Sequence, residues 1–158
     1  MLFLWIYGDN VEHRVGRGRF LLYYLGTGAA ATLSHAMFFP TSGLPLVGAS
    51  GAISGVLGFY FLWYPHNRVH ILLLFPFLVR LSVPARTLLG LYIIVENVFP
   101  FVLARGASGV AYGAHIGGFV AGLAIAHFID RRGLVEEGAQ APSSKARSIE
   151  VIITDFIH

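Results

Sequence analysis

Two polar residues in apolar surroundings carry the chemistry that this sequence suggests. Ser50 stands in the run LVGASGAISG, and His115 stands in the run GAHIGGFVAG further along the chain. A serine hydroxyl beside an imidazole can act as a nucleophile served by a general base. Ser50 and His115 are therefore a candidate nucleophile–base dyad. The alternative for Ser50 is structural, because small residues at this spacing are common where membrane helices pack closely.

The composition indicates a membrane protein. Of the 158 residues, 56% are hydrophobic and only 12% are charged, against about 25% charged in a typical soluble domain. No Asp, Glu, Lys or Arg occurs from Phe20 to Asn67. The absence of cysteine excludes disulfides and cysteine metal sites. The net charge of +3 is modest and lies in loops, so no nucleic-acid-binding surface is predicted.

Apolar segments of about 20 residues predict spans of a bilayer. We expect an all-α fold, a polytopic bundle of transmembrane helices in residues 1–130, followed by a polar, disordered tail in residues 131–158. The short segment 69–79 contains Pro76 and is predicted to be interfacial or re-entrant. Residues 1–7 resemble the second half of a further span. The predicted complete spans are 20–39, 47–64, 87–104 and 109–129.

Lys and Arg predict the orientation of these segments. They gather in residues 9–19, in residues 65–86 and in the tail, whereas the two intervening loops carry only Arg105. The positive-inside rule places the three basic regions in the cytoplasm. The tail is therefore predicted to be cytoplasmic.

This orientation makes segments 47–64 and 109–129 parallel, with both beginning at the outer face. Ser50 and His115 each lie a few residues inside their segment. At 1.5 Å per residue both are predicted about 5–10 Å below the outer boundary.

Small residues predict where the two segments touch. Glycines on the first segment, and small residues together with His115 on the second, recur at spacings of three and four residues, which places them on one helix face. Such faces are where helix backbones approach closely in a bilayer. Contact between the two faces would bring Ser50 and His115 together. The glycines predicted to pack around the site are Gly48, Gly51, Gly55, Gly118 and Gly122.

Two other ionisable residues lie within the apolar segments. Glu96 and His35 are functional candidates because charged groups are costly in a membrane. With His115 they would suit a proton relay in a small transporter, although the paired broken helices of transporters are not seen. No H-E-x-x-H motif occurs, so no metal site is predicted.

Taken together, the two motifs resemble those of the rhomboid intramembrane serine proteases. GASG at 48–51 is similar to the family's G-x-S-G motif, and AHIGGFVAG at 114–122 is similar to A-H-x-x-G-x-x-x-G. The resemblance runs from Met1 to about Ile129. It implies a six-helix core, of which about four and a half helices are present here. It also implies a dyad without a cofactor, in which Ser50 is the nucleophile and His115 is the general base and acid.

The resemblance further implies an endopeptidase that cleaves transmembrane-helix substrates near the outer face of the membrane. Its partners would be such substrates and the lipid bilayer. A multi-pass location in a bacterial plasma (inner) membrane is expected. The alternative is a catalytically inactive rhomboid-like protein that binds transmembrane helices.

Two departures from the family pattern affect the expected site. The H-x-x-x-N motif, whose side chains help to form the oxyanion hole, would lie upstream of Met1, which we expect to be an internal methionine of a longer protease. The backbone N–H of Ser50 is then the oxyanion donor expected in this chain. Ser54 stands where some members have a tyrosine stacked on the histidine. Another group must therefore hold His115.

Overall fold

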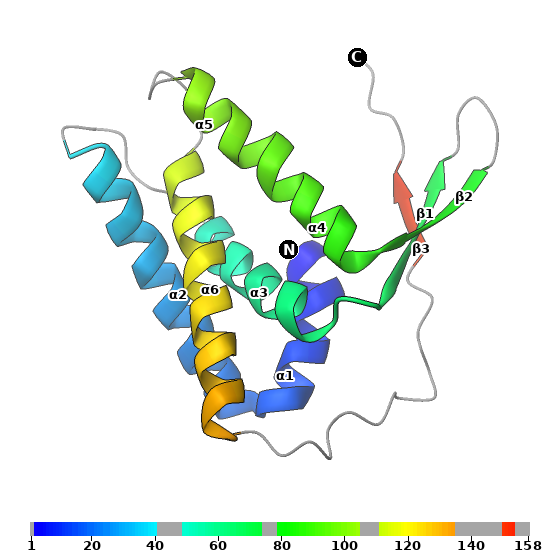
Figure 1. The fold of residues 1–158 in the computed structure, drawn as a ribbon, viewed down its shortest axis with the longest axis horizontal. Helices are drawn as coiled ribbons and strands as arrows, with labels where there is room; N and C mark the ends of the chain where they lie inside the picture. The colour runs from blue at the N-terminus through cyan, green and yellow to red at the C-terminus, as the bar shows by residue number, and fades with distance from the viewer. Residues whose placement is uncertain (1, 41–48, 74–78, 105–110, 135–149, 154–158) are drawn as a thin grey trace.

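Helices make up most of the computed structural model, which describes residues 2–40, 49–73, 79–104, 111–134 and 150–153. The predicted helical bundle is confirmed (Figure 1). In chain order the helices, with η marking a π-helix, are η1 (Leu4–Gly8), α1 (Asp9–Val15), α2 (Arg17–Phe38), α3 (Ser50–Trp63), α4 (Ala85–Ile93), η2 (Ile94–Val98), α5 (Phe99–Ala104) and α6 (Tyr112–Arg132).

α3 is the central helix of the bundle. Ten of its 14 residues are buried, and its sequence is apolar on all sides, as expected for a helix enclosed by protein. The predicted span 47–64 is corrected here, because the helix begins only at Ser50. Its 14 residues extend over about 21 Å, less than the hydrocarbon core of about 30 Å. Residues 41–48, which precede it, lie outside the described part of the chain.

α2 packs on both α3 and α6 with one face and exposes the opposite face. Only Thr27 and Ala31 of its 22 residues are buried. In water this much exposed apolar surface would be unfavourable, whereas lipid tails accept it at no cost. The large apolar side chains that α2 exposes are Leu21, Leu22, Leu25, Leu33, Met37 and Phe38.

Glycines let α3 and α6 touch through their backbones. A Cβ on Gly118 would collide with the carbonyl oxygen of Gly51, and a Cβ on Gly122 would collide with that of Gly55. The predicted glycine contact is present, with one correction. The Cα–H bonds of Gly51 and Gly55 face α2, where a Cβ on Gly55 would collide with Thr27. α3 is therefore held closely on two sides, because Gly51 and Gly55 admit α2 while their carbonyls meet the glycines of α6.

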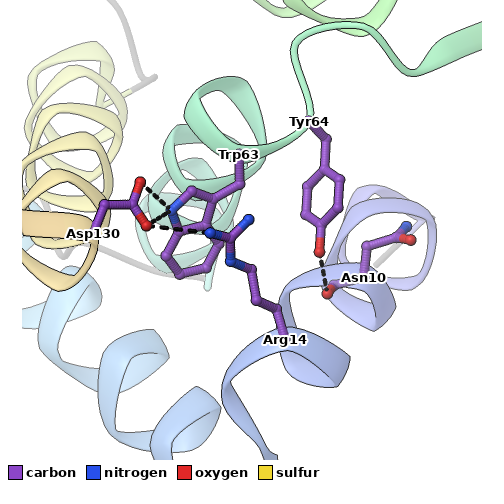
Figure 2. A network of polar contacts seen from close by, with 5 residues as sticks. All are labelled: Asn10, Arg14, Trp63, Tyr64 and Asp130. Atoms are coloured by element: carbon purple, nitrogen blue, oxygen red, sulfur yellow. Dashed lines mark hydrogen bonds and ion pairs between the residues drawn. The ribbon is translucent and has the colours of Figure 1, made fainter. Parts of the chain in front are cut away.

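A polar network ties the far end of α3 to α6 and α1 (Figure 2). The indole Nε1 of Trp63 donates to both carboxylate oxygens of Asp130 at 3.0 Å. Arg14 pairs with the same carboxylate at 3.2 Å, and its guanidinium lies 4.5 Å from the Trp63 ring centroid. The hydroxyl of Tyr64 donates to the carbonyl of Asn10 at 2.9 Å. A shared carboxylate thus joins three helices at one end of the bundle.

This end also collects basic residues, as predicted. Arg14 lies near the end of α1, and Arg19 in α2 donates to the carbonyl of Leu134 just beyond α6 at 3.4 Å. The basic region 9–19 and the end of α6 therefore share one side of the bundle. That this side faces the cytoplasm stays a prediction.

α4, η2 and α5 form one continuous helix that crosses beside α6 (Figure 1). By length and composition two described helices could cross a membrane, namely Ala85–Leu103 and Tyr112–Arg132. The first of them presents a broad apolar surface. Its exposed large side chains are Leu91, Ile94, Val95, Val98, Phe99, Val102 and Leu103.

A small sheet lies beside the bundle. β1 (Arg68–Leu73) pairs antiparallel with β2 (Val79–Pro84) and parallel with β3 (Glu150–Ile153). The segment predicted to be interfacial or re-entrant therefore contains strands, on either side of residues 74–78, which are not described.

The predicted tail needs a partial correction. α6 extends to Arg132, and Glu150–Ile153 forms a strand where disorder was expected. The β-branched run Val151–Ile153 favours this conformation. Residues 135–149 and 154–158 lie outside the described part, so a disordered, cytoplasmic tail stays a prediction for them.

Candidate active site

Ser50 and His115 meet at the beginnings of two parallel helices. Ser50 is the first residue of α3, and His115 lies in the first turn of α6. The Ser50 Oγ lies 2.9 Å from the His115 Nε2, across a sequence separation of 65 residues. This distance is within the range of a hydrogen bond. The contact here and the Trp63–Asp130 contact at the opposite end require α3 and α6 to run parallel.

The two side chains differ in exposure. Ser50 is exposed, whereas His115 is partly buried. The hydroxyl is therefore accessible to a reactant while the imidazole is surrounded by protein. A nucleophile within hydrogen-bond reach of a base is the arrangement that covalent hydrolytic catalysis requires.

A third side chain completes a chain of polar contacts. The Oδ1 of Asn97, in η2, lies 2.7 Å from the His115 Nδ1. The Nδ2 of Asn97 donates to the carbonyl of Tyr92 at 3.4 Å. Asn97 is only 1% exposed. The group that the sequence required to hold His115, in place of a stacked tyrosine at Ser54, is thus an amide from another helix.

The start of α3 supplies backbone donors near the Ser50 hydroxyl. The first hydrogen-bonded turn runs from the N–H of Ile53 to the carbonyl of Ala49, at 2.9 Å. N–H groups in the first turn of a helix have no partner one turn earlier. They also carry the positive end of the helix dipole. The Ser50 N–H, the predicted oxyanion donor, belongs to this turn.

The packing glycines lie at the same level as the site or below it. Gly51 and Gly118 bring the two helix backbones together one residue after Ser50 and three residues after His115. Gly55 and Gly122 repeat this contact one turn further along. Gly48, also predicted to pack here, lies outside the described residues.

The other ionisable candidates are not joined to this pair. Glu96 is exposed on η2, although its neighbour Asn97 is buried. His35 packs against the ring of Phe39 at 5.3 Å between centroids, and its Nδ1 is buried without a hydrogen-bond partner among the described residues. In the same part of the chain no hydrogen bond connects Glu96 or His35 to His115. Within the described ranges, the proton-relay hypothesis therefore gains no support from direct side-chain contacts.

Sequence reasoning did not single out Asn97. Its signal was a polar residue inside an apolar segment, which favours a functional role. The same signal applied equally to Glu96 next to it. The direction of each side chain depends on η2, a π-helical turn that shifts the helical register. Such a turn is not visible in the spacing of the apolar residues.

The site holds no cluster of metal ligands in the ranges that the structure describes. There, no three His, Cys, Asp or Glu side chains come close enough together to hold a metal ion. The described residues bring together a hydroxyl, an imidazole, an amide and backbone N–H groups at the site.

Comparison with known proteins places the chain in a family. The rhomboid domain family model matches residues 1–132. Rhomboid protease GluP of Bacillus subtilis is 35% identical over 121 residues, which cover 77% of this chain and 20% of that protein. Rhomboid protein 1, mitochondrial, of Saccharomyces cerevisiae is 29% identical over 142 residues, which cover 83% of this chain and 37% of that protein.

The chain thus spans well under half the length of either relative. No solved structure matches it. The family model nevertheless covers most of the chain and both motifs of the site. The protein therefore belongs to the rhomboid family of integral membrane proteins.

Proposed function

We propose that the protein is an intramembrane serine endopeptidase in which Ser50 is the nucleophile and His115 is the general base and acid. The observation that carries this proposal is the 2.9 Å contact between Ser50 Oγ and His115 Nε2 at the exposed start of α3. Its membership of a family that includes a protein named as a protease supports the same reading.

The proposed reaction proceeds in two halves. The Ser50 Oγ attacks the scissile carbonyl carbon while the His115 Nε2 takes its proton. The carbonyl oxygen becomes an oxyanion, and the backbone N–H groups that open α3 stabilise it. The tetrahedral intermediate then collapses, and His115 gives its proton to the leaving amine. Water, deprotonated by His115, attacks the resulting ester and releases the acid, which restores the Ser50 hydroxyl.

The proposed substrates are transmembrane helices cleaved near the outer face. A peptide bond in a helix is protected, because its N–H and C=O are bonded within the segment and lipid offers no substitute partners. Substrates with small or helix-destabilising residues at that depth would unwind most easily and are expected to react best. The proposal includes a bacterial plasma membrane as the location, although the two relatives come from a bacterium and from a mitochondrion.

Labelling with a fluorophosphonate tests this proposal directly. The protein, in its own membranes, should form one covalent adduct, and peptide mapping should place that adduct on Ser50. Ser50→Ala and His115→Ala should both abolish the labelling. Ser54→Ala is the matched control, because Ser54 lies one turn further along α3 and is only 2% exposed. It should leave the labelling intact.

A second outcome has a definite meaning. If the folded wild-type protein takes up no label and cleaves no transmembrane substrate, the protease proposal fails. The inactive, helix-binding rhomboid-like protein would then replace it. Capture of transmembrane helices by the wild-type protein, without cleavage, would be its signature.

A further inference from the structure

We infer that Asn97 is a positioning residue that holds His115 in the tautomer and orientation needed to accept the Ser50 proton. This inference rests on the proposed function and extends the dyad to a Ser–His–Asn series. Its basis is the unbroken line of contacts from Ser50 Oγ through both ring nitrogens of His115 to the Asn97 amide.

The hydrogen-bond partners of Asn97 decide which way its amide faces. The carbonyl of Tyr92 can only accept a hydrogen bond, so the Nδ2 of Asn97 must point toward it, at 3.4 Å. The Oδ1 is then left facing the His115 Nδ1, at 2.7 Å. An amide oxygen can only accept, and therefore Nδ1 must carry the proton of the neutral ring.

This assignment determines the state of the other ring nitrogen. A neutral imidazole with its proton on Nδ1 has a free lone pair on Nε2. That nitrogen faces the Ser50 Oγ at 2.9 Å, so the hydroxyl donates to it. The ring is thereby prepared to act as a base toward Ser50. The opposite tautomer would present an N–H to the hydroxyl and could not take its proton.

The burial of Asn97 makes the loss of its hydrogen bond to His115 costly. At 1% exposure, water cannot replace a lost partner, and an unpaired buried amide is costly. η2 packs against α6 and turns Asn97 inward while Glu96 stays exposed. π-Helical turns within α-helices are frequent at functional sites. The same role is filled by asparagine in the Cys–His–Asn series of papain-like proteases.

Two variants separate positioning from simple packing. Asn97→Leu removes both hydrogen bonds and keeps a branched side chain of similar size. Asn97→Asp keeps an acceptor for the Nδ1–H. Glu96→Gln, at the exposed neighbouring position, is the matched control. Each variant of the protein is to be compared in two measurements, the kinetics of fluorophosphonate labelling and the ¹⁵N spectrum of labelled histidine in bicelles at alkaline pH.

The expected results differ between the variants. Asn97→Leu should lower the maximal labelling rate about 10- to 100-fold, with little change in the affinity for the reagent. Its His115 signal, assigned by difference from His115→Gln, should lose the Nδ1-protonated pattern. Asn97→Asp should keep that pattern and retain labelling, and the Glu96→Gln control should match the wild-type protein.

The contrary results are equally definite. Wild-type labelling and an unchanged tautomer in folded Asn97→Leu would overturn the inference. If that variant does not fold, a lost Nδ1-protonated pattern in Asn97→Asp would overturn it instead. The histidine spectrum needs no activity. A wild-type protein that is unlabelled but carries the Nδ1 proton would therefore refute the protease proposal and leave the role of Asn97 intact.

Discussion

Replacing Gly122 with alanine tests the backbone contact between α3 and α6. A Cβ at this position would meet the carbonyl oxygen, carbonyl carbon and Cα of Gly55. All three are backbone atoms, so no side chain can rotate away. α3 cannot retreat either, because Thr27 of α2 lies against the other side of Gly55 and is fully buried. The added methyl group must therefore push whole helices apart.

Two opposing terms set the size of the effect. Alanine is favoured over glycine inside a helix by about 1 kcal/mol. Overpacking a close contact costs about 1–3 kcal/mol, and the upper end applies because only backbone surrounds the new methyl. The variant should be less stable by about 2 kcal/mol in net terms. Separation of the helices should also move His115 away from Ser50 and slow the phosphonate labelling.

Gly26→Ala is the matched control. Gly26 is also helical, in α2, and a Cβ there would have nothing within 4 Å. It should gain up to about 1 kcal/mol from helix propensity. The free energy of unfolding, measured by steric trapping in bicelles, should thus separate the two variants by about 3 kcal/mol. Equal stability of the two variants would refute the close α3–α6 contact.

Two further pairs of substitutions test the opposite end of the bundle and the connection between α1 and α2. Trp63→Phe removes the indole N–H that donates a hydrogen bond to Asp130. The free energy of unfolding should fall by about 2 kcal/mol, because hydrogen bonds to charged groups contribute about that much. Arg17→Ala is the control, because it breaks an ion pair whose arginine side chain is 94% exposed. It should cost less than about 1 kcal/mol in the same assay. A larger loss for Arg17→Ala than for Trp63→Phe would contradict the importance of the contact between Trp63 and Asp130. Gly16→Ala should destabilise by about 1–3 kcal/mol, because its φ of 83° and ψ of 154° suit glycine alone. Gly18→Ala, in a helical position with open space around it, should not destabilise, and thermal unfolding of the pair in detergent would detect the difference.

Much of the bundle was predictable from local pattern. Apolar segments, the placement of arginines and the spacing of glycines predicted parallel helices, with Ser50 and His115 at one level. These predictions succeeded because they depend on helix geometry, which sets which residues share a face. The predicted length of α3 was too long, since a helix enclosed by protein does not have to extend across the whole bilayer to be stable.

What the sequence by itself determined is therefore the set of chemical groups, the class of fold and the faces on which small residues gather. What only the tertiary structure decided is what each face meets. Gly55 admits Thr27 of α2 while its carbonyl meets Gly122 of α6, and a periodic pattern cannot distinguish these two neighbours. Likewise Asn97 and not Glu96 reaches His115, because adjacent helical residues point to different sides and only the packing of η2 against α6 decides which side meets the histidine. The physical reason is the same in both cases, since periodicity describes one helix and a contact requires two.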